Sequence, residues 1–194
     1  MKPLVFSHPK IRLATPADAA VAAPLIIQAM EDLACFFVNS KKPSDALPLF
    51  ETFFKQKRNQ YSFEHTLVYE ESDQVAGTLT AYDGGALKAL RAPFLKHIEE
   101  EYSIENFHLE EETEVGELYI DTVSVNPHFQ GLGIGTKLIK ACFEKAEQLN
   151  YDRVGLIVDL ENPQAQKLYE RLDFKKIKTR QFMGGEYTHM QYFL

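Results

Sequence analysis

The 194-residue chain has 45% hydrophobic and 25% charged residues, which is typical of a soluble globular protein with a core of its own. Its formal net charge of −7 and pI near 5.4 argue against a nucleic-acid partner, because affinity for the phosphate backbone depends on clustered Lys and Arg. A cationic small-molecule partner fits this charge better.

The most apolar stretch of the chain is AAVAAPLIIQAM, residues 19–30. Pro24 breaks it, and it is shorter than the ~20 residues that a membrane-spanning helix needs. Arg12 and Asp18 precede it closely, which argues against a secretory signal. These features predict a cytoplasmic protein with no membrane partner.

Cysteine and histidine spacing predicts no metal site. Cys35 and Cys142 show no CxxC pattern, and the six histidines show no HxH or HxxxH pair. We expect both cysteines to be reduced and buried.

The first half of the chain alternates helix and strand signals. IRLA (11–14) reads as a strand, and Thr15 is placed to cap a helix that follows it. A second helix is expected over 44–56, where three phenylalanines recur at helical spacing. Two strands, 66–71 and 74–82, then predict an antiparallel hairpin.

Residues 83–116 interrupt this regular pattern. They contain a helical run that we expect Pro93 to interrupt, followed by an acidic stretch, and we interpret them as an insertion over one face. The acidic side chains of this region are Glu99, Glu100, Glu101, Glu105, Glu110, Glu111, Glu112, Glu114 and Glu117. Such a run forms either a solvated face or a field that attracts a cation.

The second half predicts four strands and two helices without a linker or repeat, so we expect a single domain over 1–194. The expected elements are a strand at 117–125, a helix ending near 149, a strand at 153–160, a helix at 162–172 and strands at 174–182 and 188–194. The terminal strand is expected at a sheet edge, where it could pair between subunits as a homodimer.

Residues 125–138, VNPHFQGLGIGTKL, place three glycines on alternate positions just before a helix: Gly131, Gly133 and Gly135. A glycine inside a regular element is unfavourable by roughly 1 kcal/mol relative to alanine, so the pattern indicates close approach of a ligand. Free backbone N–H groups and the helix dipole at such a turn favour a phosphate or pyrophosphate.

Three phosphate-binding motifs could explain this loop. A P-loop is excluded because no Lys follows the last glycine at the required spacing. A dinucleotide fold stays open, since Asp159 closes the next strand, but the pattern is GxGxGT and not GxGxxG.

The third explanation is a resemblance to a known family. The pattern V-x-V-x-P-x-x-Q-x-x-G-x-G resembles the acyl-CoA-binding signature of the GNAT superfamily of N-acetyltransferases. Its residues here are Val123, Val125, Pro127, Gln130, Gly133 and Gly135. The segment ENPQAQKLYERLDF (161–174) is similar to the segment that follows in that family, with Asp173 where glycine is usual.

The resemblance implies an α/β fold with a mixed, mainly antiparallel sheet flanked by helices. It implies acetyl-CoA as acyl donor, with the pantetheine arm and acetyl carbonyl bound by backbone groups of Val123 and Val125. It also implies pyrophosphate binding by loop amides, those of Gln130, Gly131, Leu132, Gly133, Ile134, Gly135 and Thr136. Asn162 would bind the pantetheine, cap its helix, or do both.

The resemblance further implies transfer of the acetyl group to a primary amine by direct attack in a ternary complex. Tyr169 matches the tyrosine that protonates the leaving thiolate, unless it is a core residue of its helix. For the amine proton, Asp121 is the first candidate base and Glu117 the second. The alternative for Asp121 is a structural carboxylate, since an Asp inside an apolar strand is unfavourable unless it is paired or functional.

Two other functions stay open at this stage. A non-catalytic acyl-CoA sensor would keep the loop and need neither proton-transfer residue. A transferase of a longer acyl group would use the same loop, because the loop binds CoA and not the acyl chain. We expect the acceptor to be a small-molecule or peptide amine. The acidic insertion would attract this amine by its charge or cap the cleft that binds it.

Overall fold

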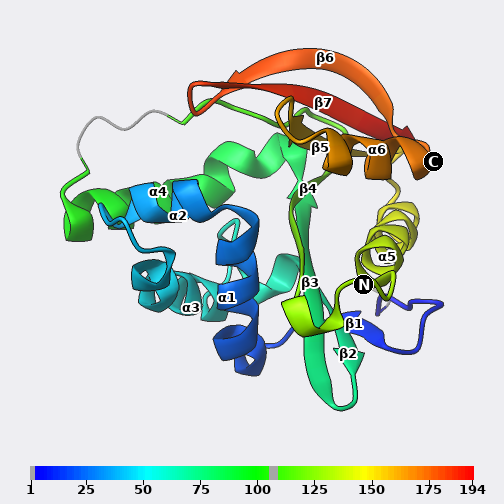
Figure 1. The fold of residues 1–194 in the computed structure, drawn as a ribbon, viewed down its shortest axis with the longest axis horizontal. Coiled ribbons are helices and arrows are strands. Elements are labelled where there is room, and N and C mark those ends of the chain that lie inside the picture. Colours follow the sequence, from blue (N-terminus) through cyan, green and yellow to red (C-terminus); the bar gives the residue numbers. More distant parts are fainter. Residues whose placement is uncertain (1–2, 105–108) are drawn as a thin grey trace.

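A seven-stranded sheet forms the centre of the protein in the computed structural model, which describes residues 3–104 and 109–194 (Figure 1). The strand order is β1-β2-β3-β4-β5-β7-β6, and every neighbouring pair is antiparallel except β4 and β5. The strands are β1 (Ile11–Leu13), β2 (Thr66–Glu71), β3 (Gln74–Asp83), β4 (Leu118–Val125), β5 (Arg153–Asp159), β6 (Lys175–Phe182) and β7 (Gly185–Phe193). The mixed, mainly antiparallel sheet predicted from the sequence is confirmed.

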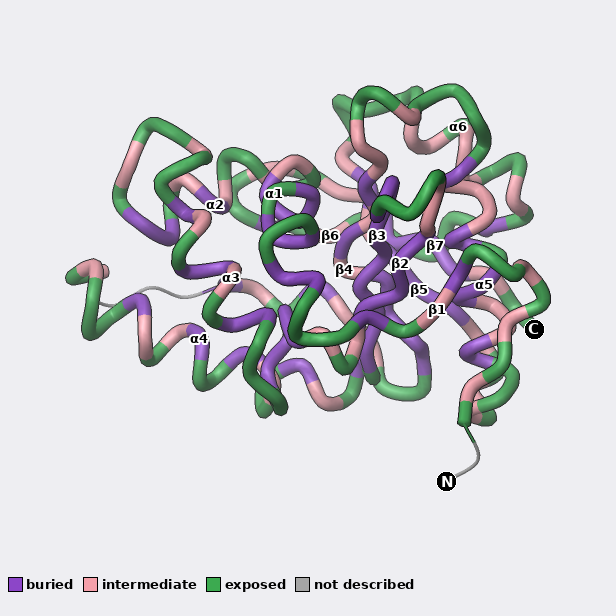
Figure 2. Tube along the Cα trace, turned by 90° about the horizontal axis from the view of Figure 1, so that it is seen from below, coloured by how far each residue is buried: buried purple, intermediate pink, exposed green. Residues whose placement is uncertain are grey.

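Helices cover both faces of the sheet, with α1 to α4 on one face and α5 and α6 on the other (Figure 1). Their bounds are α1 (Ala19–Ala29), α2 (Glu31–Phe37), α3 (Leu47–Lys55), α4 (Leu87–Tyr102), α5 (Ile134–Gln148) and α6 (Pro163–Arg171). The buried residues concentrate along the central strands, whereas α6 and β6 are largely exposed (Figure 2). The helical faces therefore supply two cores, one on each side of the sheet.

Aromatic packing holds the helices α2, α3 and α4 together. The rings of Phe37 and Phe94 meet edge to face at 4.8 Å between centroids, and those of Phe50 and Tyr61 do the same at 4.8 Å. All four side chains are fully buried, so the core of this face is built largely from rings in favourable tilted contacts. The phenylalanine spacing of the predicted second helix is confirmed.

The helix of the predicted insertion at 83–116 is continuous, unlike its prediction. α4 runs without interruption from Leu87 to Tyr102 with Pro93 inside it, so the expected break at Pro93 is wrong. The packing of Phe94 and Ile98 into the core holds the helix through the proline. Glu105 of the predicted acidic run lies outside the described residues.

The predicted sheet edge is also wrong. The terminal strand β7 lies between β5 and β6 and pairs with both along its length, so the described edges are β1 and β6. The lysines of β6 are typical of an edge strand that avoids pairing with other chains. The homodimer stays a prediction without the support of an exposed terminal strand.

In the described part of the chain, no single helix has the length and apolar composition to cross a membrane. One pair of consecutive helical segments has both only when taken together, Pro16–Ala29 with Glu31–Phe37, and this pair is bent by 108°. Cys142 is buried as expected, whereas Cys35 is partly exposed, and both thiols are free.

Candidate active site

The strands β4 and β5 are parallel but pair only at their first residues. The pairs are Leu118 with Val154 and Tyr119 with Gly155, and beyond them the two strands separate. Among the described residues, the edges that then face each other have no strand partner. We call this place the β4–β5 divergence; it leaves backbone hydrogen-bonding groups free for another molecule.

The backbone of Val123 and Val125 faces the β4–β5 divergence. The neighbouring Asn126 donates its N–H to the Ala76 carbonyl of β3 at 2.9 Å, and in an antiparallel ladder such bonds alternate along the strand. The two valines therefore point their N–H and C=O groups away from β3. Gln130 donates its side-chain amide to the Val125 carbonyl at 3.1 Å, which ties the loop to the strand.

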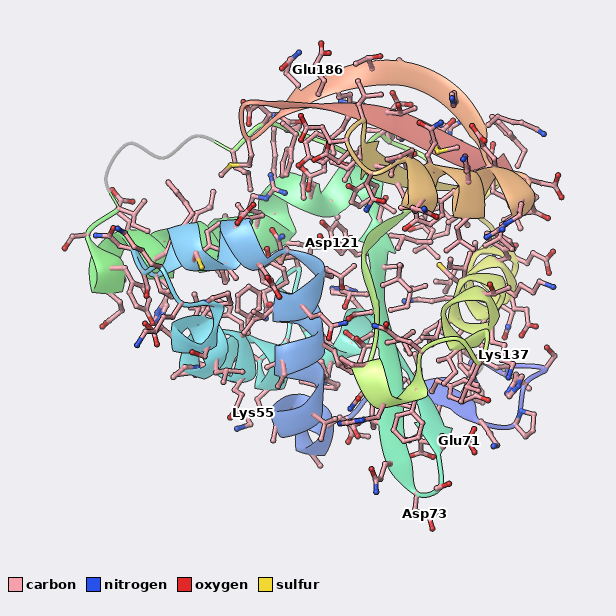
Figure 3. All side chains as sticks on the ribbon, viewed as in Figure 1. Lys55, Glu71, Asp73, Asp121, Lys137 and Glu186 are labelled. Atoms are coloured by element: carbon pink, nitrogen blue, oxygen red, sulfur yellow. The ribbon has the colours of Figure 1, made fainter. Side chains whose placement is uncertain are left out.

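A β-bulge interrupts β4 at Asp121. The ladder pairs Thr80 with Thr122 and Ala81 with Ile120, so Asp121 is the extra residue. The bulge reverses the alternation of side chains, since aliphatic residues on both sides of it pack toward α5. Asp121 itself lies on the opposite face, near the centre of the molecule and toward α1 to α4 (Figure 3).

Two polar side chains hold one oxygen of the Asp121 carboxylate. Tyr82 donates its hydroxyl to Oδ2 at 3.1 Å, and Gln60 donates its amide to the same atom at 3.4 Å. No described residue donates a hydrogen bond to Oδ1. Burial, and next the nearby Glu112 carboxylate, raise the pKa of Asp121 to about 7. Asp121 can therefore gain and lose a proton near neutral pH.

The glycine loop is open to a ligand. Gly131 and Gly133 have φ of 79° and 72°, which favour glycine, and a Cβ at either would meet no atom within 4 Å. Gly133 is the N-cap of α5, and its carbonyl accepts the first hydrogen bond of the helix, from the Lys137 N–H at 3.1 Å. The amides at the start of α5 thus lack helical acceptors and can bind an anion.

Tyr169 and Asn162 lie on and before α6. Asn162 accepts a hydrogen bond from the Ala165 N–H at 3.0 Å, so its capping role is confirmed. Tyr169 meets Phe174 edge to face at 5.7 Å, and burial raises the pKa of its phenol to about 12. The phenol is therefore protonated at neutral pH and is able to donate.

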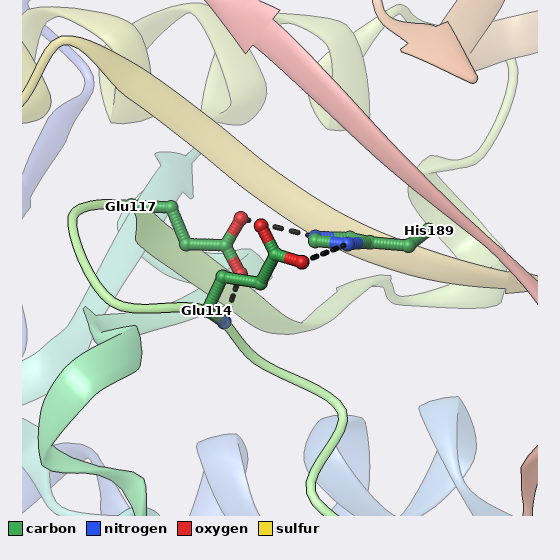
Figure 4. Close-up of side chains that lie close together, drawn as sticks. All are labelled: Glu114, Glu117 and His189. Atoms are coloured by element: carbon green, nitrogen blue, oxygen red, sulfur yellow. Dashed lines mark hydrogen bonds and ion pairs between the residues drawn. The ribbon is translucent and has the colours of Figure 1, made fainter. Parts of the chain in front are cut away.

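Glu117 occupies an enclosed position before β4. Its carboxylate is fully buried and accepts hydrogen bonds from Gln191 at 2.7 Å and from the Glu114 N–H at 2.8 Å, with His189 Nε2 at 3.0 Å (Figure 4). Every one of these contacts comes from inside the fold. The structure thus gives Glu117 the surroundings of a structural carboxylate.

Glu114, Glu117 and His189 are the group in the described residues whose ligand atoms lie close enough to hold a metal ion, within 4.8 Å of one another. Lys178 and Arg180 already pair with the Glu114 carboxylate. Because these cations would repel a metal ion, the geometry favours a structural ion-pair cluster.

The comparison with family models decides the class of protein. The model of the acetyltransferase (GNAT) family matches residues 27–174, about three quarters of the chain. The chain is a GNAT acetyltransferase. The resemblance of the glycine loop and of the α6 segment to this family is thereby confirmed.

Solved structures of similar proteins agree with the GNAT assignment. A crystal structure of an acetyltransferase is 31% identical, with a TM-score of 0.80 over 94% of this chain and 98% of the other. An N-acetyltransferase from Staphylococcus aureus Mu50 is 26% identical, with a TM-score of 0.79 over 94% and 99%. The ribosomal-protein-S18-alanine N-acetyltransferase from Escherichia coli, 14% identical with a TM-score of 0.57 over 93% and 90%, shares the fold. No curated protein matches the chain.

GNAT acetyltransferases generally use acetyl-CoA, and the residues of this chain fit it. The uncrowded glycines and free α5 amides suit the pyrophosphate. The edge of β4 that lacks a strand partner suits the pantetheine amides, apart from the Val125 carbonyl, which already accepts from the side chains of Gln28 and Gln130. The individual contacts of Gln130, Leu132, Ile134, Gly135 and Thr136 with CoA stay predictions.

Sequence reasoning did not place any residue beside Asp121 in this GNAT acetyltransferase, although it named Glu112 in the acidic run. Gln60 precedes β2, Tyr82 lies in β3, Arg91 lies in α4, and Glu112 lies in the loop before β4. No spacing links these positions in the chain. The bulge did leave a signal, because the aliphatic residues of LYIDTVSV change their alternation after Asp121.

Proposed function

We propose that this GNAT acetyltransferase transfers the acetyl group of acetyl-CoA to a primary amine of a small molecule or peptide, by direct attack in a ternary complex. The proposal is carried by Asp121, a carboxylate with a pKa of about 7 on the bulge of β4, beside the free backbone of Val123. The N-acetyltransferase from S. aureus, which shares the whole fold at 26% identity, supports N-acetylation.

The chain's own residues would handle two protons in this reaction. As the amine nitrogen bonds to the acetyl carbon, Asp121 takes the amine proton, directly or through water. As the carbon–sulfur bond breaks, Tyr169 gives its phenolic proton to the thiolate and regains one afterwards. A backbone N–H of β4 would stabilise the charge that develops on the carbonyl oxygen.

Asp121 is the better base of the two carboxylates. Its Oδ1 receives no hydrogen bond from a described residue and its side chain is half-buried, whereas Glu117 is enclosed by donors. A base must be reachable by the proton that it accepts, so we assign this role to Asp121. We also propose a cytoplasmic protein that acts without a metal ion.

Release of free thiol from acetyl-CoA, measured against a panel of amines, tests the proposal. Release should depend on one class of amine and should fall strongly in Tyr169→Phe. Acetyl-CoA that binds but releases no thiol with any amine would instead support a sensor. The same assay with longer acyl-CoA donors tests the acyl preference.

A further inference from the structure

Arg91 of α4 joins three segments of the chain behind Asp121. It is buried, with 5% of its surface exposed, and uses all three nitrogens of its guanidinium. Nε donates to the Gln60 side-chain oxygen at 3.0 Å, Nη1 donates to the Glu110 carbonyl at 3.2 Å, and Nη2 pairs with the Glu112 carboxylate. The Gln60 N–H also donates to the Leu90 carbonyl at 3.1 Å, so α4 holds this residue twice.

Arg91 fixes the direction of the hydrogen bond that reaches Asp121. A guanidinium can only donate, so the Gln60 oxygen must face Arg91 and the Gln60 amide nitrogen must face Asp121. Asp121 is then offered a donor, which its ionised form prefers. Without Arg91, the Gln60 amide could turn over and present its oxygen instead.

Arg91 and Glu112 also act on Asp121 in opposite directions through their charges. The guanidinium lowers the pKa of Asp121, whereas the Glu112 carboxylate raises it. One oxygen of Glu112 is buried without a partner among the described residues, which leaves part of its charge uncompensated. The titratable or charged groups that interact electrostatically with Asp121 or with its buried neighbours are Tyr61, Tyr82, Arg91, Glu112, Tyr119 and, next to Tyr119, Glu117.

We infer that Arg91 is a positioning residue of this enzyme, which orients Gln60 as a donor to Asp121 and, with Glu112, balances the charge around that carboxylate. The inference rests on the proposed role of Asp121 as the base. It also gives helix α4 a part in proton transfer, beyond covering one face of the sheet.

Charge-neutral variants of the pair test the balance of charge. Glu112→Gln should move the acidic limb of the kcat/KM profile to lower pH by about 1 unit, and Arg91→Gln should move it upward by a similar amount. The double variant should return the limb close to that of the wild type. Lys88→Gln is the matched control, because Lys88 lies one turn earlier on α4 and pairs with Glu111 at the surface; its limb should stay in place.

Arg91→Lys separates orientation from charge. Lysine keeps the positive charge but cannot donate to Gln60, Glu110 and Glu112 together. The acidic limb should then stay near its wild-type position while kcat falls about 10-fold. A kcat equal to that of the wild type would remove the orienting role of Arg91.

Titration of the Asp121 carboxyl by NMR, in the same variants, separates this inference from the proposed function. Opposite shifts of the Asp121 titration in Glu112→Gln and Arg91→Gln confirm the positioning role of Arg91. If the titration shifts but the pH profile of the rate does not, Asp121 is not the base and only the proposed function fails. An unchanged Asp121 titration in every variant overturns the inference, whatever happens to activity. If Arg91→Gln does not fold, Glu112→Gln and the double variant still decide between these outcomes.

Discussion

The Glu117 carboxylate fills the space in which a side chain at Gly155 would begin. A Cβ at Gly155 would lie 2.0 Å from Glu117 Oε2, at the last residue of β5 that pairs with β4. Glycine at this position therefore leaves the room that the Glu117 carboxylate occupies while it is hydrogen-bonded to Gln191 and His189.

Gly155→Ala should therefore destabilise the protein by about 2–4 kcal/mol, because the new methyl group forces a buried, hydrogen-bonded carboxylate to move. Thermal unfolding measures this loss. Gly135→Ala is the control, since its Cβ would make only an ordinary contact with Val125 at 3.8 Å. Equal melting temperatures of the two variants would contradict the enclosure of Glu117.

Gly133→Ala should weaken acetyl-CoA binding by about 10-fold or more, because a methyl group would stand where the pyrophosphate approaches the amides. Gly184→Ala is a matched control: its φ of 75° is close to the 72° of Gly133, and both positions are uncrowded. Both variants should lose a similar ~1 kcal/mol of stability from backbone strain. Calorimetric titration with acetyl-CoA should separate them, and equal affinities would remove the loop from the binding site.

Asp121→Asn should lower kcat by about 100-fold or more while acetyl-CoA affinity holds, because an amide cannot accept the amine proton. In the wild type, kcat/KM should fall below about pH 7, where Asp121 becomes protonated. Steady-state rates of thiol release, measured from pH 5 to 9 for both proteins, test both effects. A profile of the Asn variant that matches the wild-type profile would exclude Asp121 as the base.

The same residue makes a prediction for stability. The folded protein holds the Asp121 proton up to about pH 7, while the unfolded chain releases it near its ordinary pKa. The wild type therefore loses stability as pH rises through this window, and Asp121→Asn should not. The advantage of the variant should grow by on the order of 4 kcal/mol between pH 4 and 8, as measured by urea unfolding. A constant difference would show that Asp121 ionises normally.

Tyr169→Phe should reduce kcat about 10- to 100-fold with little change in KM for acetyl-CoA, because it removes only the donor of a proton. Phenylalanine preserves the edge-to-face contact with Phe174. The melting temperature should therefore stay near that of the wild type. Full activity in this variant would return Tyr169 to the role of a core residue.

His65 should make the protein less stable in acid, whether or not the roles proposed for Asp121 and Tyr169 are correct. Burial, and next the Lys145 ammonium, lower the pKa of His65 to about 4. As pH falls, the unfolded chain therefore binds this proton first, and stability is lost between about pH 6.5 and 4. His65→Phe should remove about 2 kcal/mol of the difference in unfolding free energy between pH 7 and 5. The exposed His128→Phe is the control, and equal slopes in all three proteins would contradict the prediction.

The sequence was most informative where function restricts single residues. The glycines at 131 and 133 and the cap at Asn162 each have a local reason, backbone geometry or a side-chain hydrogen bond, that can be recognised in a short segment. The environment of Asp121 has no such local reason. Gln60, Arg91 and Asp121 lie tens of residues apart, and only the packing of α4 brings them together.

The order of the last strands shows the same limit. Sequence periodicity identified 174–182 and 188–194 as strands but could not say which one lies inside the sheet. The lysines of β6 were the available signal, because charged side chains protect an exposed edge. The continuous helix through Pro93 had no such signal, since its support comes from the aromatic residues of α2 and α3.

Among the described residues, two residue pairs form the whole ladder between β4 and β5. The shared core under α5 and the hydrogen bonds of Glu117 to His189 and Gln191 hold the two strands in place beyond that short ladder. The facing edges of β4 and β5 are therefore the part of the sheet whose backbone amides can gain partners from a bound molecule. Hydrogen exchange should slow mainly along these two edges when acetyl-CoA is added.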